Sequence, residues 1–78
     1  MNQTEALTWI AVLFEEPPEK IQPDTPREAI PAWDSLGVLT LMAALDEEFD
    51  IVLTEEETQT IQSIQDILNV LNKNGKIG

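Results

Sequence analysis

The chain has 78 residues, of which 42% are apolar and none is cysteine. This length supports one small hydrophobic core, so we expect a single domain over residues 1–78, held by packing and not by disulfides or a thiolate metal cage. Fifteen acidic residues against four basic ones give a formal charge of −11, which disfavours nucleic acid and anionic membrane surfaces as partners. Basic protein surfaces are the partners that this charge favours.

The apolar segment near the N-terminus predicts an amphipathic helix over residues 4–15, with Thr4 as its N-cap. Its core residues recur at helical spacing and are Leu7, Ile10, Ala11 and Phe14. The segment is far too short to span a bilayer, and the acidic Glu5 before it does not fit a signal peptide. We therefore expect a cytoplasmic protein.

A long connector follows, because all five prolines lie between Pro17 and Pro31. The Pro17-Pro18 pair is expected to end the first helix. Within the connector, Thr25-Pro26-Arg27-Glu28 fits one short turn, with threonine as its cap and glutamate completing a capping box.

The central helix is predicted to begin at Asp34 or Ser35 and to run to about Phe49. We assign its i, i+3, i+4, i+7, i+11 stripe to the core, and the stripe consists of Val38, Leu41, Met42, Leu45 and Phe49. Another side of the helix carries a second apolar strip of Leu36, Leu39 and Ala43, which continues into Asp46 and Glu47. A second strip calls for an explanation other than burial in the core.

Two capping patterns predict two further helices. Thr54-Glu55-Glu56-Glu57 is a capping box with acids in the first turn, so a short helix begins there. Ser63 is the expected N-cap of a last helix, which ends at Lys73 to Gly75 and has the stripe Ile64, Ile67, Leu68 and Leu71. No segment alternates convincingly with the period of a strand. The sequence therefore predicts an all-α fold, a small antiparallel bundle of three main helices plus one short helix.

Ser35 lacks the partners of a catalytic serine. A nucleophilic serine needs a base, usually histidine, and the chain has no histidine. The pattern Gly-x-Ser-x-Gly is also absent, because Trp33 occupies the first glycine position. We therefore expect no catalytic residue and no enzyme activity. Taken alone, Asp34-Ser35 is simply a helix N-terminus capped by aspartate.

The residues from Asp34 to Asp50 nevertheless resemble the modification site of the acyl carrier proteins. The Asp34-Ser35-Leu36 triplet opens the apolar helix, and Leu45-Asp46-Glu47-Glu48-Phe49-Asp50 is similar to the acidic helix end of that family. The resemblance extends over nearly the whole chain and implies the same bundle fold. It also implies a 4′-phosphopantetheine arm, attached to Ser35 by a phosphopantetheinyl transferase at a motif that includes Asp34 and Leu36. The thiol of such an arm carries acyl groups as thioesters.

In carriers, enzymes dock on the side of the helix that adjoins the serine. By this resemblance the partner-binding residues are Leu36, Leu39, Thr40, Ala43, Asp46 and Glu47. The expected partners are acyl-loading and acyl-processing enzymes with basic docking patches. The acids that would steer these enzymes, although they also keep a small protein soluble, are Asp46, Glu47, Glu48, Asp50, Glu55, Glu56 and Glu57. We expect a monomer. We also expect no metal site, because the calcium-loop pattern is missing.

The motif departs from the common fatty-acid pattern, which usually has acids where Gly37 and Thr40 stand. This difference predicts a more apolar contact near Ser35, and a specialised discrete carrier for fatty-acid, polyketide or related secondary biosynthesis. Two alternatives stay open. An aminoacyl or D-alanyl carrier shares the serine and the bundle, and an unmodified acidic interaction domain would use Ser35 only as a helix residue.

The two tryptophans have structural and functional interpretations. Trp9 lies off the main stripe of the first helix and is expected to cover the edge of the bundle. Trp33 either packs under the connector or lines the entrance used by the arm. We favour packing.

Overall fold

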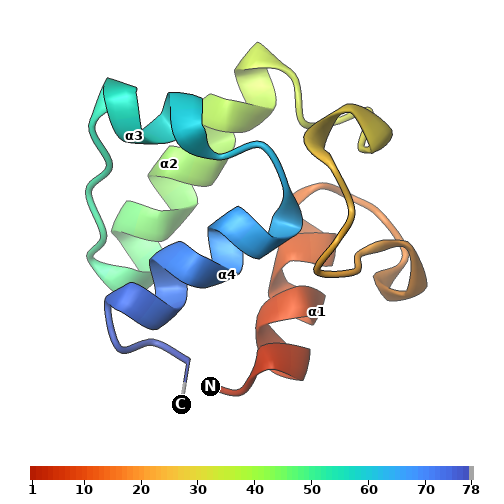
Figure 1. The fold of residues 1–78 in the computed structure, drawn as a ribbon, viewed down its shortest axis with the longest axis horizontal. Helices are drawn as coiled ribbons and strands as arrows, with labels where there is room; N and C mark the ends of the chain where they lie inside the picture. Colours follow the sequence, from red (N-terminus) through yellow and green to blue (C-terminus); the bar gives the residue numbers. More distant parts are fainter. Residues whose placement is uncertain (78) are drawn as a thin grey trace.

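The structure, a computed structural model, describes residues 1–77. Its elements, in chain order, are α1 (Gln3–Leu13), η1 (Pro18–Lys20), η2 (Arg27–Ala29), α2 (Ser35–Phe49), α3 (Glu55–Thr60) and α4 (Ile64–Lys73) (Figure 1). Over these residues the β pairing is limited to one isolated bridge between Pro26 and Ser63. The prediction of an all-α bundle with three main helices and one short helix is confirmed.

The first helix begins earlier than the sequence analysis predicted. Asn2, not Thr4, is its N-cap, because the Asn2 Oδ1 accepts from the Glu5 N–H at 2.8 Å while a Glu5 carboxylate oxygen accepts from the Asn2 N–H at 3.0 Å. This capping box satisfies two N–H groups, whereas Thr4 lies within the first turn and its carbonyl accepts from Thr8. The helix also ends at Leu13 and not at residue 15, and Glu15 adopts a left-handed φ of 56°.

The connector contains two 3-10 turns. The second, η2, lies where one turn was predicted, but its cap position is Pro26 and the capping box with Thr25 is wrong. The Thr25 hydroxyl instead accepts from the Gln22 N–H at 3.0 Å, within the connector itself. The first turn, η1, was not predicted, although Pro18 at its first position is a residue that favours such a start.

Backbone hydrogen bonds fix the connector to the beginning of α4. The Arg27 N–H donates to the Gln62 carbonyl at 2.8 Å, and the Ile64 N–H donates to the Thr25 carbonyl at 3.0 Å. Because these residues are far apart in the sequence, the bonds hold the segment before α2 in one place. Ser35 follows this segment directly, so these bonds also fix the position of Ser35.

The core combines residues from α1, α2, α4 and the segments between the helices. On α2, Leu41 and Leu45 are buried and the rest of the predicted stripe is half-buried, so the core face of this helix is confirmed. The predicted stripe of α4 is buried throughout. The remaining buried apolar residues are Ala6, Ile10, Ala11, Phe14, Ile21, Ile30, Trp33, Ile51, Leu53 and Ile61.

Both tryptophans pack against other rings. Trp33 is buried and stacks on Phe14 with 5.1 Å between ring centroids, which agrees with the packing interpretation. Trp9 is half-buried and meets Phe49 edge-on at 5.0 Å, so it covers the edge between α1 and α2. Such pairs add about 0.5–1.5 kcal/mol beyond the area they bury.

The helices enclose this core from several sides. In the view of Figure 1, α4 lies in front of α2, α1 lies beside them, and α3 crosses near the first half of α2. Met1 lies close to the segment after α4, and its ammonium donates to the Lys76 carbonyl at 3.2 Å. Among the described residues, no helix has the length and apolar character needed to cross a membrane.

Candidate functional site

Ser35 is the first residue of α2, and its side chain is exposed. Asp34 precedes it in an extended conformation and caps the helix, with its Oδ1 accepting from the Gly37 N–H at 2.9 Å. The first helical bond runs from the Val38 N–H to the Asp34 carbonyl at 2.9 Å. Asp34 therefore performs the capping, and the Ser35 hydroxyl is not required for it.

Gly37 lies in the same turn but is buried. A Cβ built on this residue would overlap the carbonyl oxygen of Ala32, so the glycine permits the end of the connector to approach the helix closely. From the sequence, Gly37 was interpreted as a position near the serine that lacks the acid usual in fatty-acid carriers. Its burial shows that it lies under the connector and not on the exposed side of α2.

The other side of α2 is exposed along most of its length. Leu36 and Leu39, one helical turn apart on this side, are 70% and 61% exposed. All six residues of the expected partner-binding strip lie on the surface, and they are Leu36, Leu39, Thr40, Ala43, Asp46 and Glu47. The Thr40 hydroxyl donates to the Leu36 carbonyl at 3.0 Å, within this strip.

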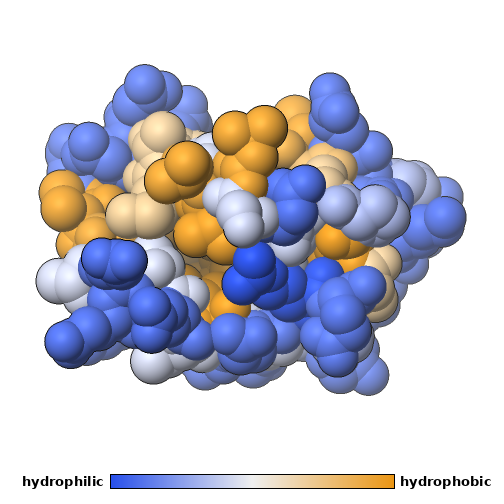
Figure 2. All heavy atoms as spheres, turned by 90° about the horizontal axis from the view of Figure 1, so that it is seen from above, coloured by the Kyte–Doolittle hydropathy of each residue, from blue (hydrophilic) through white to orange (hydrophobic). Residues whose placement is uncertain are grey.

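A groove of ≈ 470 Å³ opens beside Ser35, between α2 and α3. One wall is apolar and comes from α2, while α3 and η2 supply polar groups; its lining consists of Arg27, Ser35, Val38, Leu39, Met42, Glu55, Thr58 and Gln59. Figure 2 views the end of the molecule where α2 begins, and shows apolar side chains around hollows between polar ones. A second hollow, ≈ 410 Å³, lies toward the end of α1 and is lined in part by Val12, Asp34 and Leu36.

Neither this groove nor the position of Arg27 in it was predicted from the sequence. Arg27 is half-buried, and its Nε–H donates to the Trp33 carbonyl at 3.0 Å. It is the only basic residue among those that line the groove. The signal that the sequence offers is that Arg27 is its single arginine and lies in the proline-rich connector.

The acidic side chains do not all have the same role. In the capping box of α3, hydrogen bonds from the backbone and side chain of Thr54 lower the pKa of Glu57 below its ordinary value. Asp46 and Glu47 are exposed on α2 beside the apolar strip. Within residues 1–77 no group of carboxylates is arranged to hold a metal ion.

The chain is similar to several acyl carrier proteins. No family model matches it. An acyl carrier protein from Thermosynechococcus vestitus is 32% identical over 76 residues, which cover 92% of this chain and 94% of that protein. Acyl carrier proteins from Bdellovibrio bacteriovorus and Campylobacter concisus are 37% and 42% identical over 43 residues, 55% of this chain and 55% and 56% of theirs. With such identity along nearly its full length, the chain belongs to the acyl carrier protein family, whose members are carriers and not enzymes.

Proposed function

We propose that the chain carries acyl groups as thioesters on a 4′-phosphopantetheine arm attached to the Ser35 Oγ, in fatty-acid, polyketide or related secondary biosynthesis. The observation that carries this proposal is the exposed Ser35 at the junction of connector and helix, with its cap already supplied by Asp34. Because the chain has no histidine to activate the hydroxyl, a separate phosphopantetheinyl transferase attaches the arm.

The surroundings of Ser35 suit a phosphodiester. The Ser35 and Leu36 N–H groups lie in the first turn of α2, where no preceding helical carbonyl pairs with them, and the positive end of the helix dipole favours an anion. These groups offset repulsion from Asp34. The arm, once bound, supplies the thiol that forms the thioester, and the protein supplies its position and its exposure to other enzymes.

The exposed side of α2 is the proposed docking surface for the transferase and for acyl-loading and acyl-processing enzymes. Its exposed leucines support this role, because Leu36 and Leu39 lie one turn apart beside Ser35 and offer apolar area that a partner enzyme would bury. Asp46 and Glu47 lie beyond them and would attract basic patches, which raises association rates without slowing release. With Thr40 in place of an acid near the serine, the contact is more apolar than electrostatic, which favours a specialised carrier.

Intact-mass analysis tests the attachment. We expect a broad-specificity transferase with coenzyme A and magnesium to add one arm to the wild-type protein and none to Ser35→Ala. The substitution removes only an exposed hydroxyl that does not cap the helix, so the free energy of unfolding should change by less than about 1 kcal/mol.

The matched control replaces the other serine of the chain, Ser63, which has a structural role. Ser63 caps α4, so Ser63→Ala should lose about 1 kcal/mol of stability and still accept the arm. Modification of Ser35→Ala, or none of the wild type, would refute the attachment and favour an unmodified acidic interaction domain.

A further inference from the structure

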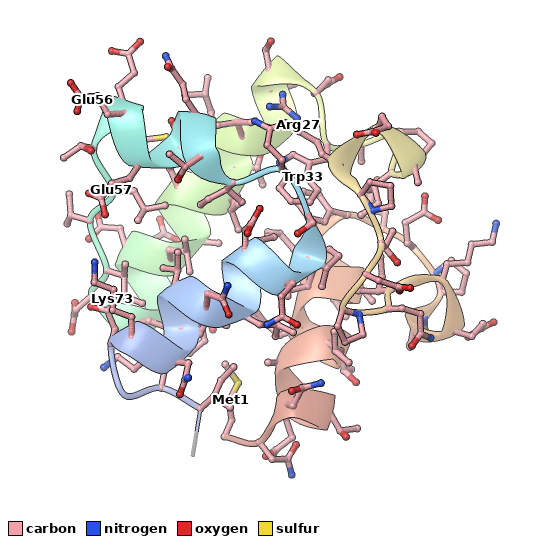
Figure 3. All side chains as sticks on the ribbon, viewed as in Figure 1. Met1, Arg27, Trp33, Glu56, Glu57 and Lys73 are labelled. Carbon is pink, nitrogen blue, oxygen red and sulfur yellow. The ribbon has the colours of Figure 1, made fainter. Side chains whose placement is uncertain are left out.

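Arg27 is held beside Ser35 by contacts on two sides. Its backbone N–H donates to the Gln62 carbonyl at 2.8 Å, and its Nε–H donates to the Trp33 carbonyl at 3.0 Å. The side chain is half-buried and lines the same groove as Ser35. In Figure 3, Arg27 lies close to the beginning of α2, on the side of α3. The guanidinium is thus held at the groove that Ser35 also lines.

The bond to Trp33 occupies one of the five N–H donors of the guanidinium. The remaining four, on the two Nη atoms, can pair with another acceptor. A guanidinium is a flat fork that matches two oxygens of a phosphate, which a lysine ammonium does not. Arg27 is the only arginine in the chain, and the three lysines are not among the residues that line this groove.

We propose that Arg27 binds the phosphodiester of the arm on Ser35. This inference rests on the proposed function, because the phosphodiester is present only when the arm is attached. The arm adds a negative charge directly after Asp34 in a chain that already has a formal charge of −11. Charged hydrogen bonds from Arg27 offset that repulsion and hold the base of the arm against the groove. Arg27 is in this sense a positioning residue.

A purely structural role for Arg27 makes a different prediction. Its bonds to Trp33 and Gln62 exist without the arm, so their loss would weaken the unmodified and the modified protein equally. A contact with the phosphodiester stabilises only the modified protein. A double-mutant cycle over the arm and residue 27 cancels the shared contribution and leaves the contact between them.

The test compares Arg27→Gln with Lys20→Gln, which removes the same charge from an exposed position in η1 that does not line the groove. Unmodified and modified forms of each protein are prepared and verified by intact mass. Urea unfolding then gives the change in the unfolding equilibrium constant that attachment causes. In Arg27→Gln we expect attachment of the arm to raise the unfolding equilibrium constant by roughly threefold to tenfold more than it does in the wild-type protein. In Lys20→Gln the effect of attachment should equal that in the wild type. The ³¹P resonance of the arm should shift only in Arg27→Gln.

If Arg27→Gln does not fold, the wild-type protein decides the question. Since the chain has one arginine, its guanidinium ¹⁵N–¹H resonances are unambiguous, and attachment of the arm should shift those of the Nη groups. Unshifted guanidinium resonances, or equal effects of attachment in all three proteins, would overturn the role of Arg27 while the arm itself stands. If the transferase adds no arm to the wild-type protein, the proposed function is refuted instead.

Discussion

Gly37 shows how one residue without a side chain sets the position of the serine two residues before it. It is buried where the connector crosses the first turn of α2, and a Cβ there would overlap the Ala32 carbonyl oxygen. The obstacle is backbone, which cannot rotate away like a flexible side chain. Helix propensity alone favours alanine over glycine by about 1 kcal/mol. Replacing Gly37 with alanine therefore has two opposing effects on the free energy of unfolding, a loss from the overlap with Ala32 and a gain in helix propensity. Their sum can be measured.

We predict that Gly37→Ala lowers the free energy of unfolding by about 1–3 kcal/mol, because the overlap with Ala32 outweighs the gain in propensity. Urea denaturation measures the change. The control is Ala43→Gly, at an exposed position of the same helix, which should follow propensity and lose about 1 kcal/mol. A Gly37→Ala protein as stable as the wild type would show that the connector moves aside without cost.

At the scale of elements, α2 divides its apolar residues between two tasks. Leu45 is fully buried in the bundle, whereas Leu39 is 61% exposed on the proposed docking surface. The two leucines share a helix and a residue type, so they form a matched pair. Only the first has packing partners on all sides.

We predict that Leu45→Ala destabilises the protein by about 2–5 kcal/mol, through lost burial and the cavity left behind. This is a large share of the stability of so small a domain. Leu39→Ala should leave the melting temperature nearly unchanged and slow acyl transfer to or from a partner enzyme. Thermal melts and transfer assays measure both. Equal thermal losses for the two variants would contradict the assignment of the faces.

The helices themselves were largely predictable because their signals are local. Asp34, Thr54 and Ser63 are the observed N-caps of α2, α3 and α4, as expected from their capping patterns. The start of α1 was missed although Asn2 and Glu5 have the spacing of a capping box. The capping box at Asn2 and Glu5 satisfies two N–H groups, whereas Thr4 lies inside the first turn and caps nothing.

The groove and the role of Gly37 were not predictable in the same way. Thr58 and Arg27 are distant from Ser35 in the sequence, and only the packing of α3 and η2 against α2 brings them to one groove. The contact of Gly37 with Ala32 likewise depends on the path of the connector. Local periodicity fixes where helices begin and which side is apolar, but not which distant residues meet.

For the whole molecule, charge is the dominant physical property. A formal charge of −11 is confined to a body of 27 × 25 × 19 Å. The Debye length in 0.1 M salt is about 10 Å, shorter than these dimensions, so added salt screens much of the repulsion between exposed carboxylates. The same screening weakens attraction toward a basic partner. Stability and association should therefore respond to salt in opposite directions.

We predict that rising ionic strength raises the melting temperature of the isolated protein and slows association of the arm-bearing form with a basic partner enzyme. Replacing Asp46 and Glu47 with lysines should raise stability by relieving repulsion, and should slow association by reversing the field beside the docking surface. The control reverses two exposed acids of the connector, Glu19 and Asp24, which changes the net charge equally but away from α2. Thermal melts and stopped-flow association across a salt series separate the effects. If the association rate changes neither with salt nor with the charge reversal on α2, the acids serve solubility and not steering.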